Sequence, residues 1–317
     1  MATAGLLAAC SSSGGSTSAS TDGALKKIVY IPGLTGNPFY NTVACGAKGA
    51  AKKASVDFSY QGAANFDVAE QTKIVNAVTA TNPGAIMISI TDPNAMVAPL
   101  TVAKSHGIKI IAVDGDLNDK SVMTTNIQSD GVRGGEMAGE ELARAVGRRG
   151  TVLVVDNVTG SVVAEARVKG FKKAIARYPD MKVLAVQYSN NDVSKAASIV
   201  SATAGSNRDL VGVFGVQTNN TQGALTGVRE AGKQGKVHVV GYDISDPITA
   251  ALRDGTLDGT VVQNPRGEGA TGVEAAIKAM QGKPVPRNQS ADSIFVTPEN
   301  VDSAKSRDYI YDVNCKG

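Results

Sequence analysis

The sequence is poor in the side chains that build metal centres and catalytic triads. Its 317 residues include two histidines, His106 and His238, and three cysteines, Cys10, Cys45 and Cys315. Neither histidine lies in a His-rich or Cys-rich spacing, and no C-x-x-C is present. A zinc site, a histidine-based triad and a disulfide scaffold are therefore disfavoured, and we expect no metal and no catalytic residue.

Long apolar runs and charge of one sign are also missing. No run of about 18 apolar residues is present, so no helix is expected to span a membrane. The 32 basic and 29 acidic residues are scattered, which argues against nucleic acid as a partner. There is no G-x-G-x-x-G, and the segment most like a P-loop, 227–233, is followed by Gln234 where Ser or Thr is needed. We expect no nucleotide and no other cofactor.

The N-terminus resembles that of bacterial lipoproteins. The apolar residues 2–9 end in Leu7-Ala8-Ala9 before Cys10, the order of a lipobox whose cysteine is acylated. Residues 11–24 are almost entirely Ser, Gly, Thr and Ala, a composition typical of a flexible tether. We interpret residues 1–25 as a signal remnant and tether of an exported, lipid-anchored protein in the periplasm or at the cell surface. The pattern is incomplete, because no Lys or Arg precedes the apolar stretch as in a signal peptide. The alternative is an unstructured tail with a chance cysteine.

From residue 26 onward, short β-branched runs alternate with longer segments of helical period. This alternation predicts an α/β fold of parallel, doubly wound (Rossmann-like) sheets, and the chain length favours two such lobes. Expected strands are 27–31, 85–90, 108–113, 151–155, 183–187, 211–214, 237–241 and 259–262. Expected helices are 38–53, 68–80, 94–105, 131–146, 162–177, 193–204, 219–231, 247–253 and 267–280. Asn37-Pro38 and Asp246-Pro247 each place a capping side chain before a first-turn proline.

Polar and aromatic residues follow the expected strands, where open α/β sheets bind ligands. Amides, hydroxyls and single carboxylates bond vicinal hydroxyls, and an aromatic ring can cover the C–H face of a sugar. The sequence therefore predicts a ligand rich in hydroxyl groups. The residues after the strands are Asn37-Pro38-Phe39-Tyr40, Ser89, Thr91-Asp92, Asp114, Asn157, Asn190-Asn191, Gln217, Asp243 and Gln263.

The sequence resembles the type I periplasmic sugar-binding proteins, of the ribose-binding kind. The pieces that carry the resemblance are Gly36-Asn37-Pro38-Phe39-Tyr40, Asn126-Ile127-Gln128-Ser129-Asp130, Arg167 before Gly170-Phe171, Val240-Gly241-Tyr242-Asp243, and Gln263 after Gly259-Thr260-Val261-Val262. The resemblance implies two lobes joined by three crossovers, near Ser129, Gln263 and Ser293. It assigns residues 26–129 and 264–293 to the first lobe, and residues 130–263 and 294–317 to the second.

The resemblance also implies a ligand site between the lobes. Its contacts are Asn37, Phe39, Tyr40, Ser89, Asp114, Arg167, Asn191, Gln217, Asp243 and Gln263. The chain departs from the ribose pattern at four of the family's positions: Ser89 and Gln217 replace asparagines, Gly115 replaces an arginine, and Asn191 replaces an aromatic ring. Because one face of the site then lacks a ring, we expect a small pentose or an acyclic polyol.

Several of these residues have a purely structural interpretation. Asn37 caps a helix in any case, Phe39 and Tyr40 can pack the first turn, and Asp243 can cap the next helix. Arg167 lies between Glu165 and Lys169, which suggests an exposed charged face.

The favoured function is a monomeric receptor that delivers a sugar or polyol to the membrane permease of an ABC importer. The alternatives are a sensor that presents its ligand to a receptor kinase, the effector domain of a transcriptional regulator, and a sugar-active enzyme using Glu165, Asp114 or Asp243. In an exported protein with Cys10 acylated, two cysteines remain, and we expect Cys45 and Cys315 to form a disulfide.

Overall fold

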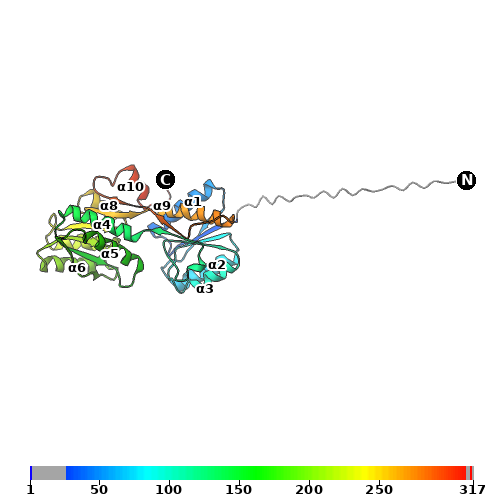
Figure 1. The fold of residues 1–317 in the computed structure, drawn as a ribbon, viewed down its shortest axis with the longest axis horizontal. Coiled ribbons are helices and arrows are strands. Elements are labelled where there is room, and N and C mark those ends of the chain that lie inside the picture. The colour runs from blue at the N-terminus through cyan, green and yellow to red at the C-terminus, as the bar shows by residue number, and fades with distance from the viewer. Residues whose placement is uncertain (2–25, 312–314, 316–317) are drawn as a thin grey trace.

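Two lobes lie side by side along the long axis of the computed structural model, which describes Met1, residues 26–311 and Cys315 (Figure 1). Each lobe is built on one sheet that is covered by helices on both faces. The expected acylation site, Cys10, lies outside the described residues. Over the described range, no helix combines the length and the apolar character needed to cross a membrane.

The first lobe holds a six-stranded parallel sheet in the order β12-β5-β4-β3-β1-β2. Helices α1 and α9 cover one face, and α2 and α3 cover the other. Apart from Tyr30 and Lys109, the central strands β1, β3 and β4 consist of Ile, Val, Met and Ala, because both faces of the sheet are covered. The strands are β1 (Ile28–Ile31), β2 (Phe58–Tyr60), β3 (Ala85–Ile88), β4 (Lys109–Val113), β5 (Thr125–Ser129) and β12 (Asn288–Ala291). The helices are α1 (Pro38–Lys53), α2 (Val68–Ala80), α3 (Val97–Ser105), α9 (Pro265–Met280) and the 3₁₀ turn η1 (Lys120–Val122).

The second lobe repeats this plan with the strand order β13-β11-β10-β9-β6-β7, and β8 also pairs with β6. Helices α4 and α5 pack on one face, and α6, α7 and α8 on the other. Its edge strand β13 runs antiparallel to β11. The strands are β6 (Gly150–Asp156), β7 (Met181–Val183), β8 (Gln187–Tyr188), β9 (Leu210–Gly215), β10 (His238–Tyr242), β11 (Gly259–Gln263) and β13 (Ser293–Val296). The helices are α4 (Gly131–Ala145), α5 (Val162–Ile175), α6 (Val193–Ser206), α7 (Thr218–Glu230), α8 (Asp246–Arg253) and α10 (Ala304–Tyr309).

The chain passes between the lobes at three places. β5 belongs to the first sheet and α4 to the second lobe; β11 belongs to the second sheet, whereas α9 packs beside α1 (Figure 1). β12 and β13 lie in different sheets and are separated by one residue, Asp292. The passages thus follow Ser129, follow Gln263 and lie at Asp292; Ser293 itself belongs to β13 of the second sheet, and the exact lobe boundaries stay a prediction.

Glycine lets one helix pair in each lobe approach closely. In the first lobe, a Cβ at Gly46 of α1 would overlap the carbonyl oxygen of Arg266 in α9. In the second lobe, a Cβ at Gly135 of α4 would overlap the carbonyl oxygen of Arg167 in α5. These two contacts set how deeply α1 and α5 sit against their partners.

Some sequence expectations were wrong in detail. The expected strand 183–187 is divided into β7 and β8, and the expected helix start at Asn94 is displaced to Val97. Asp246 does not cap α8: it is the first helical residue, and Ser245 precedes it without a side-chain hydrogen bond to the helix. The sequence did not indicate β2, β12, β13 or α10.

A disulfide joins Cys45 of α1 to Cys315, with Cα atoms 5.0 Å apart and 270 positions apart in sequence. It is the pairing expected from the cysteine count. The C-terminal segment is therefore attached to the first lobe, although α10 packs against β13 of the second.

Candidate functional site

Two aspartates end equivalent strands, one in each lobe. Asp114 follows β4 and Asp243 follows β10, and both have a left-handed backbone, with φ of 49° and 67°. Each backbone N–H donates to the neighbouring strand, Asp114 to the carbonyl of Ile127 (2.9 Å) and Asp243 to that of Val261 (2.7 Å). Such backbone strain outside glycine is concentrated at functional sites. The repeat in both lobes marks these carboxylates as a candidate site.

Arg167 is buried next to the second of these aspartates. Its side chain projects from α5, and the residue is 4% exposed, so the interpretation as a surface charge is wrong. Nη1 donates to the carbonyl of Val216 (2.9 Å) and to Oδ2 of Asp243 (3.3 Å). The guanidinium carbon lies 3.7 Å from the ring centre of Tyr242, and Nε has no hydrogen-bond partner in the part of the chain described. Two hydrogen bonds and the ring of Tyr242 therefore fix the guanidinium, and its Nε–H can still donate to a further acceptor.

Asp243 is the centre of a small hydrogen-bond network. Besides Arg167 on Oδ2, its Oδ1 accepts from Nε2 of Gln263 (2.6 Å) and from the hydroxyl of Tyr311 (2.7 Å). Gln263 is the last residue of β11, and Tyr311 follows α10. The structure thus brings together three of the predicted residues and one that sequence reasoning missed.

The start of α1 supplies the aromatic side of the site. Oδ1 of Asn37 accepts from the backbone N–H of Phe39 (2.9 Å) and of Tyr40 (3.4 Å), so Asn37 does cap this helix. The ring of Phe39 makes edge-to-face contacts with Tyr40 and with Tyr311, both with centroids 5.5 Å apart. Phe39 also packs against the core of the first lobe, which confirms its structural role; its contact with a ligand stays a prediction.

The remaining predicted residues lie in different environments. Ser89 is fully buried, and its hydroxyl bonds the phenol of Tyr30 (2.8 Å). Gln217 is partly buried and precedes α7 without capping it through its side chain. Asn191 is exposed, and its carbonyl accepts from Nδ2 of Asn219 (3.0 Å). Among the described residues, no hydrogen bond links Ser89 or Asn191 to the network around Asp243.

Glu268 is a second residue that sequence reasoning missed. It lies fully buried in the first turn of α9; Oε1 accepts from the hydroxyl of Ser129 (2.9 Å), and Oε2 has no partner within the described range. In the sequence it looks like an ordinary first-turn acid, so no signal identified it. Tyr311 had one signal, because the expected disulfide at Cys315 places the tail near α1.

Burial dominates the electrostatics of the site. It raises the pKa of Asp114 to about 6; the charge of Arg167 opposes this shift and that of Asp243 adds to it. Burial, and then the charge of Asp114, raise the pKa of Glu268 well above its ordinary value. Burial disfavours the charged form of Arg167, but Asp243 above all raises its pKa beyond the ordinary value. Since Asp114 is in the first lobe and the Arg167–Asp243 pair in the second, the site has charged groups on both sides.

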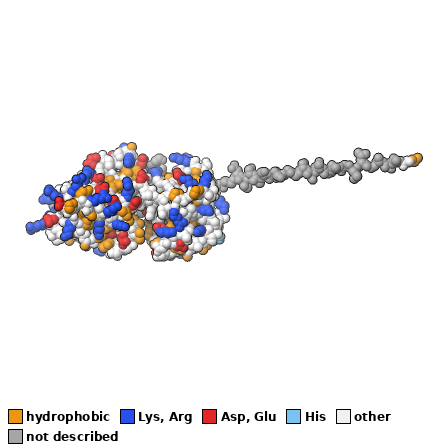
Figure 2. Space-filling model, in the orientation of Figure 1, with side chains coloured by type: hydrophobic (Ala, Val, Ile, Leu, Met, Phe, Trp, Pro, Cys, Tyr) orange, Lys and Arg blue, Asp and Glu red, His pale blue; other side chains and the backbone are white. Residues whose placement is uncertain are grey.

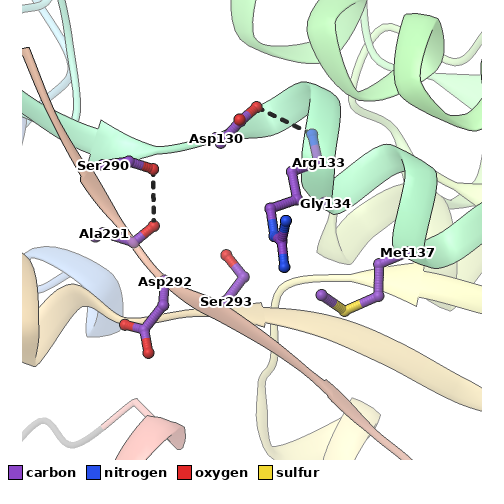
Figure 3. A pocket seen from close by; sticks show the side chains of 8 residues that line it. All are labelled: Asp130, Arg133, Gly134, Met137, Ser290, Ala291, Asp292 and Ser293. Carbon is purple, nitrogen blue, oxygen red and sulfur yellow. Dashed lines mark hydrogen bonds between the residues drawn. The ribbon is translucent and has the colours of Figure 1, made fainter.

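The crossovers are tied to one another by side chains. Besides the Ser129–Glu268 bond, Asp292 accepts from Asn264 (3.0 Å) and from the hydroxyl of Tyr309 (2.6 Å). A small pocket of about 170 Å³ lies here, lined by Asp130, Arg133, Gly134 and Met137 and by residues 290–293 (Figure 3). Because Asp114 and Asp243 do not line it, we assign this pocket to the crossovers and not to the candidate site.

Neither the surface charge visible on one face nor the placement of metal-binding side chains in the described range marks a second site. On the face shown in Figure 2, acidic and basic side chains are interspersed over the second lobe. In residues 26–311 and Cys315, no group of three or more His, Cys, Asp or Glu side chains is arranged to hold a metal ion. The network at Asp243 is therefore the strongest candidate.

Comparison with known proteins agrees with this two-lobed fold. The family described as periplasmic binding protein domain matches residues 28–284. The ribose import binding protein RbsB of Escherichia coli K12 is 28% identical over 86% of this chain and 90% of its own. A similar crystal structure is that of a solute binding protein from Agrobacterium vitis with bound α-D-tagatopyranose; it is 34% identical, has a TM-score of 0.82, and the match covers 90% of this chain and 99% of that one. Another is that of a solute binding protein from Agrobacterium radiobacter with D-arabinose; it is 28% identical, has a TM-score of 0.77, and the match covers 90% of this chain and 99% of that one.

Proposed function

Since this chain belongs to the periplasmic binding protein domain family, we propose that it captures a small sugar or polyol between its lobes and delivers it to the permease of an ABC importer. The observation that carries the proposal is the division of charged groups between lobes. Asp114 approaches from the first lobe and the Arg167–Asp243 pair from the second. A ligand that bonds to both lobes stabilises the closed arrangement. The closed arrangement then distinguishes the ligand-bound protein from the ligand-free one.

The binding chemistry follows from the residues present. Asp114 accepts hydrogen bonds from ligand hydroxyls, and Arg167 donates to ligand oxygens, which makes both contacts charge-assisted. Phe39 and Tyr40 cover the C–H surface of the ligand, and Asn37, Ser89, Gln217 and Gln263 supply further polar contacts. With Asn191 in place of a ring, we favour a pentose or an acyclic polyol. The protein acts by binding alone, as its family is one of binding proteins.

Transport is favoured over the sensor, regulator and enzyme alternatives. The E. coli relative is an import binding protein, and the two structural relatives are solute binding proteins. Export, the lipid anchor at Cys10 and the monomeric state remain parts of the proposal that rest on the sequence. The anchor keeps the loaded receptor beside its permease at the membrane.

Thermal unfolding tests ligand binding directly. We expect at least one of D-ribose, D-arabinose, D-tagatose and xylitol to stabilise the protein, because a ligand at about 100 times its dissociation constant adds about 2.7 kcal/mol. Small-angle scattering with that ligand should show a smaller radius of gyration than without it. If a bound ligand leaves the radius unchanged, the clamp mechanism is wrong.

A further inference from the structure

The C-terminal segment links the two lobes a fourth time, and it does so covalently. Tyr309 belongs to the core of the second lobe, and Ile310 and Tyr311 pack against that core. Four residues beyond Tyr311, Cys315 is bonded to Cys45 in α1 of the first lobe. The end of the chain is therefore fixed to both lobes.

Tyr311 is the residue at which this segment meets the candidate site. Its hydroxyl donates to Oδ1 of Asp243 at 2.7 Å, and its ring contacts the ring of Phe39 edge to face. One side chain thus touches a carboxylate of the second lobe and an aromatic residue of the first. Burial and the charge of Asp243 raise the pKa of the Tyr311 phenol well above its ordinary value, so it remains a hydrogen-bond donor.

We propose that Tyr311 is a specificity-determining wall of the ligand site, held in place by the Cys45–Cys315 disulfide. This inference rests on the proposed function, because it assigns a further residue to the same sugar or polyol site. The Tyr311 hydroxyl orients Asp243 for the ligand, and its ring extends the aromatic surface of Phe39. A ring at this place also leaves less room in the site, which favours five-carbon over six-carbon ligands.

If Tyr311 instead competes with the ligand for Asp243, the opposite effect on affinity is expected. Oδ1 of Asp243 already accepts two hydrogen bonds, from Gln263 and Tyr311. If the phenol had to leave before a ligand hydroxyl could bond Asp243, Tyr311 would compete with the ligand. Removing the hydroxyl alone, with Tyr311→Phe, therefore weakens binding if Tyr311 positions Asp243 and strengthens it if Tyr311 competes.

Calorimetry with D-ribose, D-arabinose, D-tagatose and xylitol provides the ligand-dependent test. We expect Tyr311→Phe to bind about tenfold more weakly than the parent, since Asp243 is then no longer held in position for the ligand by the phenol. Tyr311→Ala should in addition raise the affinity for D-tagatose relative to the five-carbon ligands. Tyr178→Phe is the matched control: Tyr178 lies in the second lobe beneath Arg148, 5.7 Å from its guanidinium carbon. Equal or tighter binding by Tyr311→Phe would overturn the proposal.

A fluorescence measurement tests, without any ligand, whether the Cys45–Cys315 disulfide holds Tyr311 in place. The chain contains no tryptophan, so Tyr311→Trp introduces a single indole at this position. We expect its emission to move to longer wavelength when Cys45→Ser and Cys315→Ser remove the disulfide, because the indole becomes more exposed to water. An unchanged emission maximum would refute the role of the disulfide in holding Tyr311.

The two measurements separate this inference from the proposed function. If none of the four ligands binds the parent protein but the emission shifts, the sugar-binding proposal fails and the placement of Tyr311 stands. If the parent binds a ligand and Tyr311→Phe binds it equally well, the proposed function stands and the role of Tyr311 is refuted.

Discussion

If Asp114 contacts the ligand as proposed, it should couple ligand binding to pH. Its pKa of about 6 means that the carboxyl is largely protonated below pH 6 and ionised above it. A ligand hydroxyl that donates to the carboxylate binds the ionised form better, so affinity should fall as the pH drops through 6, by up to about tenfold per pH unit. Calorimetry between pH 7.5 and 5 measures this dependence.

Asp114→Asn is the matched control for the pH series. Asparagine tolerates the left-handed backbone at this position, whereas alanine would add strain to the loss of the carboxylate. The variant should bind more weakly than the parent and lose the pH dependence. A parent affinity that is constant from pH 7.5 to 5 contradicts the assignment of Asp114 as a hydrogen-bond acceptor.

The same raised pKa affects the stability of the ligand-free protein. The folded state holds the Asp114 proton more tightly than the unfolded chain does. The contribution of Asp114 to the free energy of unfolding is therefore fully present below about pH 4 and is lost as the pH rises through about 6. Ligand binding and stability thus respond to pH in opposite directions over this window.

Arg167 and Asn37 should differ strongly in their effect on affinity. Arg167→Ala removes a rigid buried donor and is expected to cost about 1.5–3 kcal/mol of binding, or one to two powers of ten. Asn37→Ala should cost less, since its Oδ1 is engaged in capping α1. Arg167→Lys keeps the charge but loses the planar contact with Tyr242, so it should restore binding only in part. Wild-type affinity in Arg167→Ala would show that this side chain is not in the site.

Residues of the site were predictable where they follow a strand of the sheet. Asp114, Asp243 and Gln263 follow or end strands with clear apolar runs, so the edge on which they lie could be inferred. Tyr311 and Glu268 could not be placed in the site, because their contacts depend on how a distant tail and a returning helix pack. No local pattern encodes such packing.

At the scale of elements, the close contact between α1 and α9 makes a prediction about two glycines of one helix. Gly46→Ala should destabilise the protein by about 1–3 kcal/mol, because its Cβ would overlap the backbone of α9. Gly49→Ala should stabilise it by about 0.5–1 kcal/mol, since Gly49 is exposed with open space around it. Urea unfolding of the two variants measures the difference. Equal effects of the two substitutions would refute the close approach.

Helices were predicted more accurately than strands, for local reasons. α1 and α2 have the predicted bounds because Asn37 and Asp67 cap them through side-chain hydrogen bonds. β12 was missed because Asn-Gln-Ser-Ala has neither an apolar run nor an alternation, and its pairing with β5 alone makes it a strand. β2, only three residues long, is likewise defined by its pairing with β1.

At the scale of the whole molecule, the disulfide between Cys45 and Cys315 should be a major source of stability. It closes a loop over a sequence separation of 270, for which the chain-entropy model gives up to about 5 kcal/mol. Reduction, or Cys45→Ser with Cys315→Ser, should move the urea midpoint to lower concentration. Mass spectrometry of the unreduced protein that finds both thiols free would rule out the bond.

The exchange of strands at the end of the chain has a consequence for the order of folding. β12 completes the first sheet and β13 the second, and both lie within the last 30 residues of the 317. Until the final segment is in place, each sheet lacks one strand and exposes the unpaired edge of β5 or β11. Neither lobe can finish before the other. The two lobes are therefore expected to complete their folding together. A chain that ends before residue 288 should aggregate instead of leaving one functional lobe.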